Sequence, residues 1–216
     1  MSSSSKGVSI CVVKPGATGT TLAATAATKA KPAVITVAAT TGLADGDVIT
    51  LAADSTGLES IDGKTWVVKV DANGTDFELV GSDTTNDVGT FSAGGSMTAY
   101  SKTDMECMCF SEFSFNREEP SVIATGTYCN PNDAIASAAV AAGSVSFAGY
   151  IDITDASYKL LLESEGKDMI FRITFPNNGY IIVPVTIDSI TWEIPLDGAL
   201  SYSGTGTMKT NPRHLF

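Results

Sequence analysis

Hydrophobic and polar positions alternate with a period of two over most of residues 143–208, and one helical pattern interrupts the alternation. The alternating stretches are rich in Val, Ile, Phe, Tyr and Thr, as strands are. Tyr158, Leu161 and Leu162 fall on one helical face, with Asp155 as a candidate N-cap and Gly166 as a left-handed stop. The turn sequences FPNNG and PLDG suit hairpins. This region therefore predicts antiparallel strands that clasp one short helix.

The pattern changes over residues 33–100, where short apolar runs alternate with turn-forming segments. Five or six short strands at such close spacing predict a small barrel or sandwich. The Ala- and Thr-rich stretch 17–32 has no aromatic residue and is interpreted as a connector. The predicted strands are AVITVA, DVITLA, KTWVVKV, DFELVG and SMTAY.

The remaining segments complete a main domain around this module. Residues 8–14 form a short strand that ends at Pro15-Gly16. Residues 105–116 alternate, but their apolar side changes partway, so we expect a twist or different packing at the two ends. Farther on, Asn132 or Asp133 could cap an Ala-rich helical turn, although a loop or a contact surface is an equal alternative.

The order strand, helix, strand, hairpin, closing on DGALSYSGTGT, resembles the major tail (tube) protein of long-tailed bacteriophages, as does the short MSSSSKG before a first strand. The resemblance implies a mostly β fold: an antiparallel β-sandwich or half-barrel with one short flanking α-helix. It also implies a structural virion protein, not an enzyme, whose hexameric rings stack into a tail tube that conducts DNA during ejection. Implied partners are identical copies and the tape measure, tail terminator and distal tail proteins.

The module at residues 33–100 resembles the small β-barrel of the first catalytic-cysteine half-domain of ubiquitin-activating enzymes, and it implies a fold likeness only, because this segment contains no cysteine. We expect a discontinuous main domain, residues 1–32 and 101–216, with residues 33–100 inserted and placed on the tube exterior. Surface loops accept such insertions because loop-closure entropy grows slowly with length. The positions that carry the resemblance are Gly42, Asp45, Gly46, Gly63 and Phe77.

The charge balance of 13 basic and 24 acidic residues, a formal charge of −11, argues against nucleic-acid binding. A negatively lined conduit would let DNA slide without specific binding. By alternation, the candidates for the wall of the lumen are Glu112, Asp152, Asp188 and Glu193. The two ends of the chain are expected to reach neighbouring rings, through Ser2, Ser3, Ser4, Lys209, Arg213, His214 and Phe216.

Two apolar or small-residue strands, YIIVPVTI and ALSYSGTGTM, would aggregate if their edges were unpaired, so we expect identical copies to cover them. No stretch reaches the ~18–20 apolar residues of a membrane helix, and no secretion signal is recognised. We therefore expect assembly in the host bacterial cytoplasm, localisation in the virion tail and no membrane partner. Cys107 and Cys109 are interpreted as small buried groups, with a disulfide as the alternative.

No catalytic or cofactor-binding constellation emerges. His214 is the only histidine, and the GTGT at residues 204–207 lacks the Lys and the helix of a phosphate loop, so its glycines indicate close backbone approach. The acidic turns lack the frame of a calcium hand. Trp66 and Trp192 are both expected in the core. A receptor- or carbohydrate-binding β module, with recognition on the insert, is the alternative function.

Overall fold

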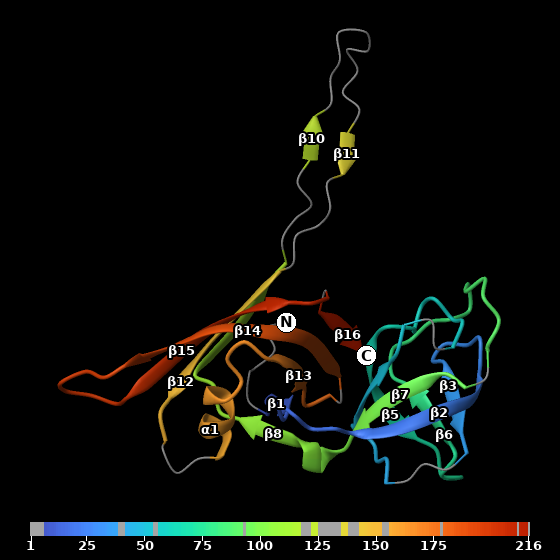
Figure 1. Cartoon of the computed structure of the whole chain (residues 1–216), viewed down its shortest axis with the longest axis horizontal. Helices are drawn as coiled ribbons and strands as arrows, with labels where there is room; N and C mark the ends of the chain where they lie inside the picture. The colour runs from blue at the N-terminus through green and yellow to red at the C-terminus, as the bar shows by residue number, and fades with distance from the viewer. Residues whose placement is uncertain are drawn as a thin grey trace.

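The computed structural model contains a curled antiparallel sheet, a closed barrel beside it and a separate pair of short strands (Figure 1). The structure describes residues 7–38, 42–53, 56–92, 94–117, 122–124, 135–137, 143–152, 156–177, 179–210 and 212–215. This architecture confirms the predicted mostly β fold with one short α-helix.

The main sheet has the strand order β8-β1-β13-β14-β15-β12-β9, with β16 added alongside β14. All of its ladders are antiparallel. The sheet contains β1 (Ser9–Val13), β8 (Met105–Met108), β9 (Glu112–Asn116), β12 (Ser144–Tyr150), β13 (Asp168–Thr174), β14 (Tyr180–Glu193), β15 (Ser201–Met208) and β16 (Arg213–Leu215). A 3-10 turn, Lys102–Asp104, leads into β8.

The sheet curls because its two outermost strands are close neighbours in sequence. Only residues 109–111 separate β8 from β9, and three residues span roughly 10–14 Å even when extended. Inside the curl, Phe110 lies 5.4 Å from Phe147 and Phe113 lies 5.4 Å from Phe171 between ring centroids. The predicted change of apolar side over residues 105–116 is thus a break between two strands.

The helix α1 (Ala156–Leu162) packs beside the curled sheet, as the periodicity predicted. Leu161 is fully buried, and the ring of Tyr158 lies 5.8 Å from that of Tyr202 on β15. Leu162 is exposed, so its predicted place on the buried face is wrong. Gly166 has φ +72°, the left-handed conformation expected after the helix, whereas Asp155 lies outside the described residues.

The barrel closes in the order β2-β3-β6-β5-β4-β7. Five of its strands match the predicted runs, and the sixth, β2, overturns the interpretation of residues 17–32 as a connector. Leu22 and Ala24 point into the barrel core while their neighbours point outward, an alternation that small residues conceal. The strands are β2 (Thr20–Ala27), β3 (Val34–Val37), β4 (Val48–Leu51), β5 (Thr65–Val70), β6 (Asp76–Leu79) and β7 (Ser96–Tyr100).

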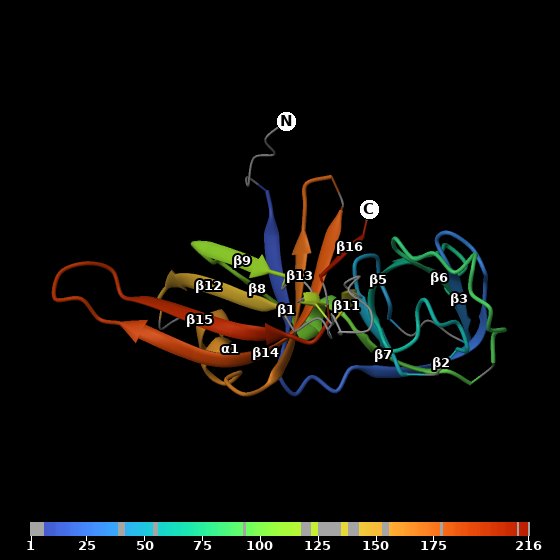
Figure 2. The ribbon, with the colours of Figure 1, turned by 90° about the horizontal axis from the view of Figure 1, so that it is seen from above.

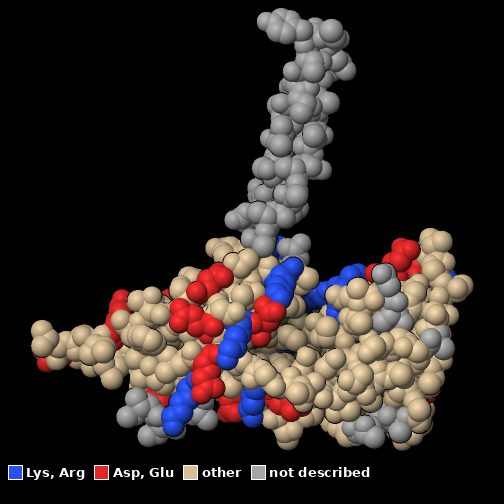
Figure 3. All heavy atoms as spheres, viewed as in Figure 1, with Lys and Arg blue, Asp and Glu red and all other residues tan. Residues whose placement is uncertain are grey.

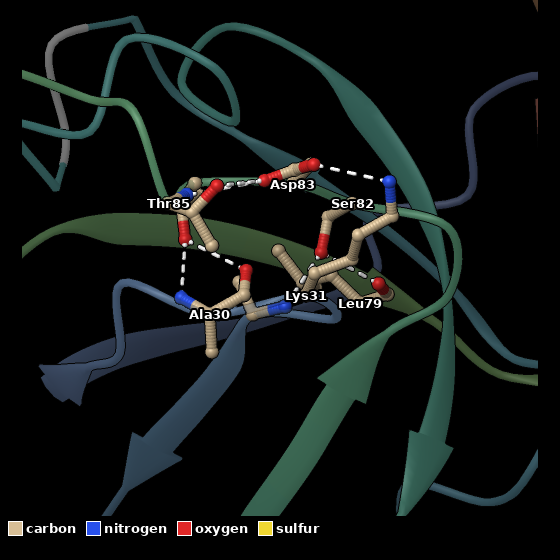
Figure 4. Close-up of polar contacts among 8 residues, drawn as sticks. Ala30, Lys31, Leu79, Ser82, Asp83 and Thr85 are labelled. Atoms are coloured by element: carbon tan, nitrogen blue, oxygen red, sulfur yellow. Dashed lines mark hydrogen bonds and ion pairs between the residues drawn. The ribbon is translucent and has the colours of Figure 1, made fainter.

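The segment after β6 is tied to the loop between β2 and β3 by side-chain hydrogen bonds. Ser82 Oγ accepts from the amide of Ala33 at 2.8 Å, and Thr84 Oγ1 accepts from that of Ala30 at 3.0 Å. Asp83 lies between Thr85 and Lys31 (Figure 4), and these two partners lower the pKa of Asp83 to about 2. The long loop is therefore anchored to the barrel through polar contacts.

The strand β14 joins the barrel to the sheet because it is buried on both faces. Ile182 belongs to the hydrophobic cluster of the barrel, and Val183 and Val185 belong to that of the curled sheet. A strand covered on both faces is apolar without alternation, which explains the run YIIVPV. The prediction that YIIVPVTI and ALSYSGTGTM form unpaired edges is wrong, since β14 and β15 are interior strands.

A buried polar contact crosses the same junction. Arg172 on β13 donates through Nη1 to the backbone oxygen of Gly46 in the barrel. Asp47 is 1% exposed and accepts from the amide of Ala44 at 2.8 Å. Burial raises the pKa of Asp47 and lowers that of Arg172, and their opposite charges attract. These contacts fix the barrel against the sheet.

The strands β10 (Val122–Ala124) and β11 (Ile135–Ser137) pair with each other and lie apart from the sheet in Figure 1. The predicted Ala-rich helical turn is wrong at residues 135–137, which are extended. Its candidate caps, Asn132 and Asp133, lie outside the described residues.

A disulfide joins Cys11 on β1 to Cys107 on β8, directly opposite in the ladder. Cys109 is a free, exposed cysteine. The interpretation of Cys107 and Cys109 as two small buried thiols is therefore wrong, and the alternative of a disulfide holds with a partner 96 residues away.

The glycines of the GTGT stretch allow close packing, as predicted. A Cβ at Gly204 would clash with the ring of Phe147, and one at Gly206 would lie 2.5 Å from Cγ1 of Val185. These glycines lie on the buried side of β15, so side chains from the neighbouring strands fill the space above them.

We expect Gly204→Ala to lower the free energy of unfolding by about 1–3 kcal/mol, because the added methyl overpacks the core against Phe147. Urea unfolding measures the change. Ser203→Ala, at an exposed position of the same strand, is the control, and equal effects of the two variants would contradict the packing.

We expect Cys107→Ser to destabilise the protein by roughly 2–5 kcal/mol, since the disulfide closes a long loop in the unfolded chain. Thermal unfolding with and without reductant measures this effect, and Cys109→Ser is the matched control. Four free thiols in the mass spectrum of the non-reduced protein would contradict the pairing.

Candidate assembly surfaces

Several large exposed apolar side chains of the main sheet gather on the hairpin that links β14 to β15. Trp192, Ile194 and Leu196 are 50%, 79% and 105% exposed. The hairpin projects beyond the sheet in both ribbon views (Figures 1 and 2), and its end carries almost no charge in Figure 3. We call residues 192–200 the hairpin tip. The expectation that Trp192 lies in the core is wrong, whereas Trp66 is 5% exposed, as predicted.

A group of large exposed apolar side chains is typical of an interaction site, because removing apolar surface from water lowers the free energy. Ordinary packing within the chain does not reach the tip, where residues 191–200 are all exposed. Tyr150, 68% exposed at the end of β12, lies opposite Ser201 at the base of the same hairpin. The apolar surface thus continues from the tip to the neighbouring strand.

One face of β9, β12, β15 and β14 exposes a field of hydroxyl groups. Ser114 and Ser146 share a hydrogen bond of 2.7 Å, and Ser189 and Thr205 share one of 3.0 Å. The buried sides of the same strands face the core. We call this the hydroxyl face. Side chains this short leave the sheet surface shallow, and a cavity of about 310 Å³ opens over it.

Three of the four predicted lumen residues lie on the hydroxyl face. Glu112 begins β9, and Glu193 follows Ser189 and Thr191 along the exposed side of β14. A bulge between Ile187 and Ser189 turns Asp188 to that side, where it accepts from Thr207 Oγ1 at 2.7 Å. Across the described residues of these four strands, no Lys or Arg is present.

The fourth residue, Asp152, is exposed and lies two residues beyond the end of β12. It follows a strand of the hydroxyl face but is not part of a strand itself. That these four carboxylates line a lumen stays a prediction. Charged side chains of both signs gather instead in a band across the middle of the face shown in Figure 3.

The predicted inter-ring residues lie in different settings. Lys209 pairs with Asp168, and this partner lowers the pKa of the Asp168 carboxyl. Arg213 lies on β16, its guanidinium 4.4 Å from the ring centroid of Trp66 in the same chain. Residues 1–6 and 216, and the side chain of His214, lie outside the described part. Contact with a neighbouring ring stays a prediction for all of them.

Among the described residues, the free sheet edges belong to short strands. The strand β9 pairs only with β12, β8 only with β1 and β16 only with β14, and β10 and β11 pair only with each other. The helix α1 packs beside β8. The barrel is closed, so it offers no edge. An extended segment from a partner could therefore add to β9.

The described residues contain neither a metal-binding cluster nor a membrane-spanning helix. Within the described ranges, no group of three or more His, Cys, Asp or Glu could hold a metal ion. Among the same residues, no helix has the length and apolar character needed to cross a membrane.

No protein-family model matches the sequence, and no curated protein matches it. A chain from the virion of a native gene transfer agent particle is similar at 18% identity, covering 53% of this chain and 92% of that chain, with a TM-score of 0.37. A chain from the tail of an empty gene transfer agent particle, solved with C6 symmetry, is similar at 20% identity, covering 49% and 79%, with a TM-score of 0.34. Both TM-scores are low, and neither likeness identifies a function for this chain. The resemblance of residues 33–100 to a half-domain of ubiquitin-activating enzymes stays a prediction.

Proposed function

We propose that this chain is a non-enzymatic structural subunit of a phage-like tail, which associates with identical copies into hexameric rings that stack into a tube. The observation that carries the proposal is the hairpin tip, an exposed apolar surface on a fold that buries most of its other large apolar side chains. Assembly removes such a surface from water, and a closed ring does so for every copy. The element order of the main sheet supports the same conclusion.

The hydroxyl face is the proposed wall of the lumen. Its carboxylates, Glu112, Asp188 and Glu193, repel phosphate, and its short hydroxyl side chains offer no cation that would retain DNA. Asp152 adds a further charge near the same end of the sheet. DNA would then pass without specific binding, as a conduit requires.

The barrel is the proposed exterior decoration. Its strands run from Thr20 to Tyr100 between β1 and β8, and it is joined to the sheet through β14 and Arg172. The division of the chain into an inserted domain and a discontinuous tail-tube domain belongs to this proposal, as do the virion location and the further tail partners. Recognition of receptors or glycans by the barrel is not favoured, because its Trp66 is 5% exposed and Arg213 lies over the ring, which is therefore not free to stack on a sugar.

We expect the double variant Ile194→Ser, Leu196→Ser to weaken self-association by about tenfold or more, since two exposed apolar side chains no longer leave water. Sedimentation velocity over a range of concentrations measures the association. Val88→Ser, at an apolar barrel residue that is 87% exposed, is the matched control. Unchanged association of the double variant would exclude the tip as an assembly surface.

We expect replacement of Glu112, Asp152, Asp188 and Glu193 by Lys to leave tubes intact in electron micrographs but to impair DNA ejection, because a basic wall retains phosphate. A DNA-release assay on assembled particles measures ejection. Lys at the exposed barrel residues Glu59 and Asp71 is the control. Normal ejection by the fourfold variant would show that these carboxylates face elsewhere.

A further inference from the structure

A cationic pocket lies where the barrel meets β16. It has a volume of about 300 Å³ and draws its lining from distant parts of the chain. Trp66 and Leu215 contribute buried apolar surface, at 5% and 2% exposure. The polar lining comes from Ser60, Arg117 and Arg213. We call this the arginine pocket.

The two guanidinium groups hold few polar partners. Arg117 donates through Nη2 to the backbone oxygen of Pro212 at 3.0 Å, and Arg213 stacks on Trp66. The buried Nη1 of Arg213 has no hydrogen-bond partner among the described residues. Across the same residues, neither arginine makes an ion pair with a carboxylate.

Arg213 stays a cation inside the pocket. Burial lowers the pKa of Arg213 to about 10, which still leaves it charged at neutral pH. Burial and the charge of Arg213 lower the pKa of the neighbouring Lys64. Two carboxylates beside Lys64 act in the opposite direction on its pKa, and both accept backbone hydrogen bonds: Asp62 from the amide of Gly57 at 2.9 Å and Asp87 from that of Ser60 at 3.1 Å.

A pair of guanidinium groups over an apolar floor fits a carboxylate best, because arginine donates two parallel hydrogen bonds to that group. The chain itself supplies carboxylates in excess, 24 acidic against 13 basic residues. Among them Asp197 is exposed at the hairpin tip, directly after Leu196. The hairpin between β14 and β15 projects from the body of the fold (Figure 1), so its tip can enter a pocket on another molecule.

We propose that the arginine pocket of one copy receives the Asp197 carboxylate of a second copy, with Leu196 packing against the apolar rim. This inference rests on the proposed self-assembly and names its contact. Tip and pocket are different surfaces, the tip at the free end of the sheet and the pocket beside the barrel, so the contact is head-to-tail. Head-to-tail contacts generate rings when the rotation closes.

Charge exchange tests the pairing. We expect Asp197→Lys and Arg117→Glu each to weaken self-association by about tenfold or more, since each places like charges together. The double variant should recover most of the loss, because it restores opposite charges. Arg117 is chosen because it is exposed, whereas Arg213 packs on Trp66 and its loss would disturb the fold. Glu165→Lys, at an exposed position after α1, is the matched control.

Sedimentation velocity of the full chain, with circular dichroism to verify folding, gives the readout. Single variants that associate like wild type, or a double variant that recovers nothing, would overturn the pairing while leaving self-assembly intact. A wild-type chain that does not associate at any concentration would overturn the proposed function itself and the pairing with it. If Glu165→Lys also weakened self-association tenfold, the effect would be a general one of charge, and the pairing would be overturned.

Discussion

The burial of β14 on both faces is the constraint on which the rest of the structure depends. One face supplies Ile182 to the barrel core and the other supplies Val183 and Val185 to the core of the curled sheet. Since burying such side chains contributes roughly 1.5–3 kcal/mol each, one strand holds two hydrophobic cores together. Arg172 crosses the same junction and makes the orientation of the barrel specific, because its donor must meet the oxygen of Gly46.

This joint leaves few backbone groups for a partner. The barrel has no edge, the apolar strands lie inside the sheet, and among the described residues of the main sheet only the short strands β8, β9 and β16 have a free edge. The proposed association therefore works mainly through side chains. The hairpin tip, the arginine pocket and the hydroxyl face are three surfaces of different chemistry on different parts of the molecule, which is the arrangement that an ordered, directional assembly needs.

Much of the fold could be predicted from local pattern. The strands β3 to β7 each contain an apolar run between turn signals, and α1 has helical spacing and a glycine stop. The strand β2 was missed because Leu22 is its only large apolar residue, and the Ala and Thr residues around it leave little contrast between inward and outward positions. The apolar run of β14 was mistaken for an exposed edge, since sequence alone does not show that a second core covers the other face.

The candidate surfaces depend on contacts between distant residues and were harder to predict. Alternation found Glu112 and Glu193, but only the bulge shows why Asp188 shares their face with Ser189. The disulfide pairs residues 96 apart, and the arginine pocket joins Arg117 to Pro212, 95 residues farther along the chain. No periodic signal links such positions. The exposure of Trp192 follows from the length of the hairpin, which carries it beyond the core.

Electron microscopy of the purified chain at rising concentration would decide whether it builds a tube. We expect hollow cylinders of constant diameter, with sixfold symmetry in end views and the hydroxyl face turned inward. A protein that stays monomeric at millimolar concentration, with no rings or cylinders, would contradict it.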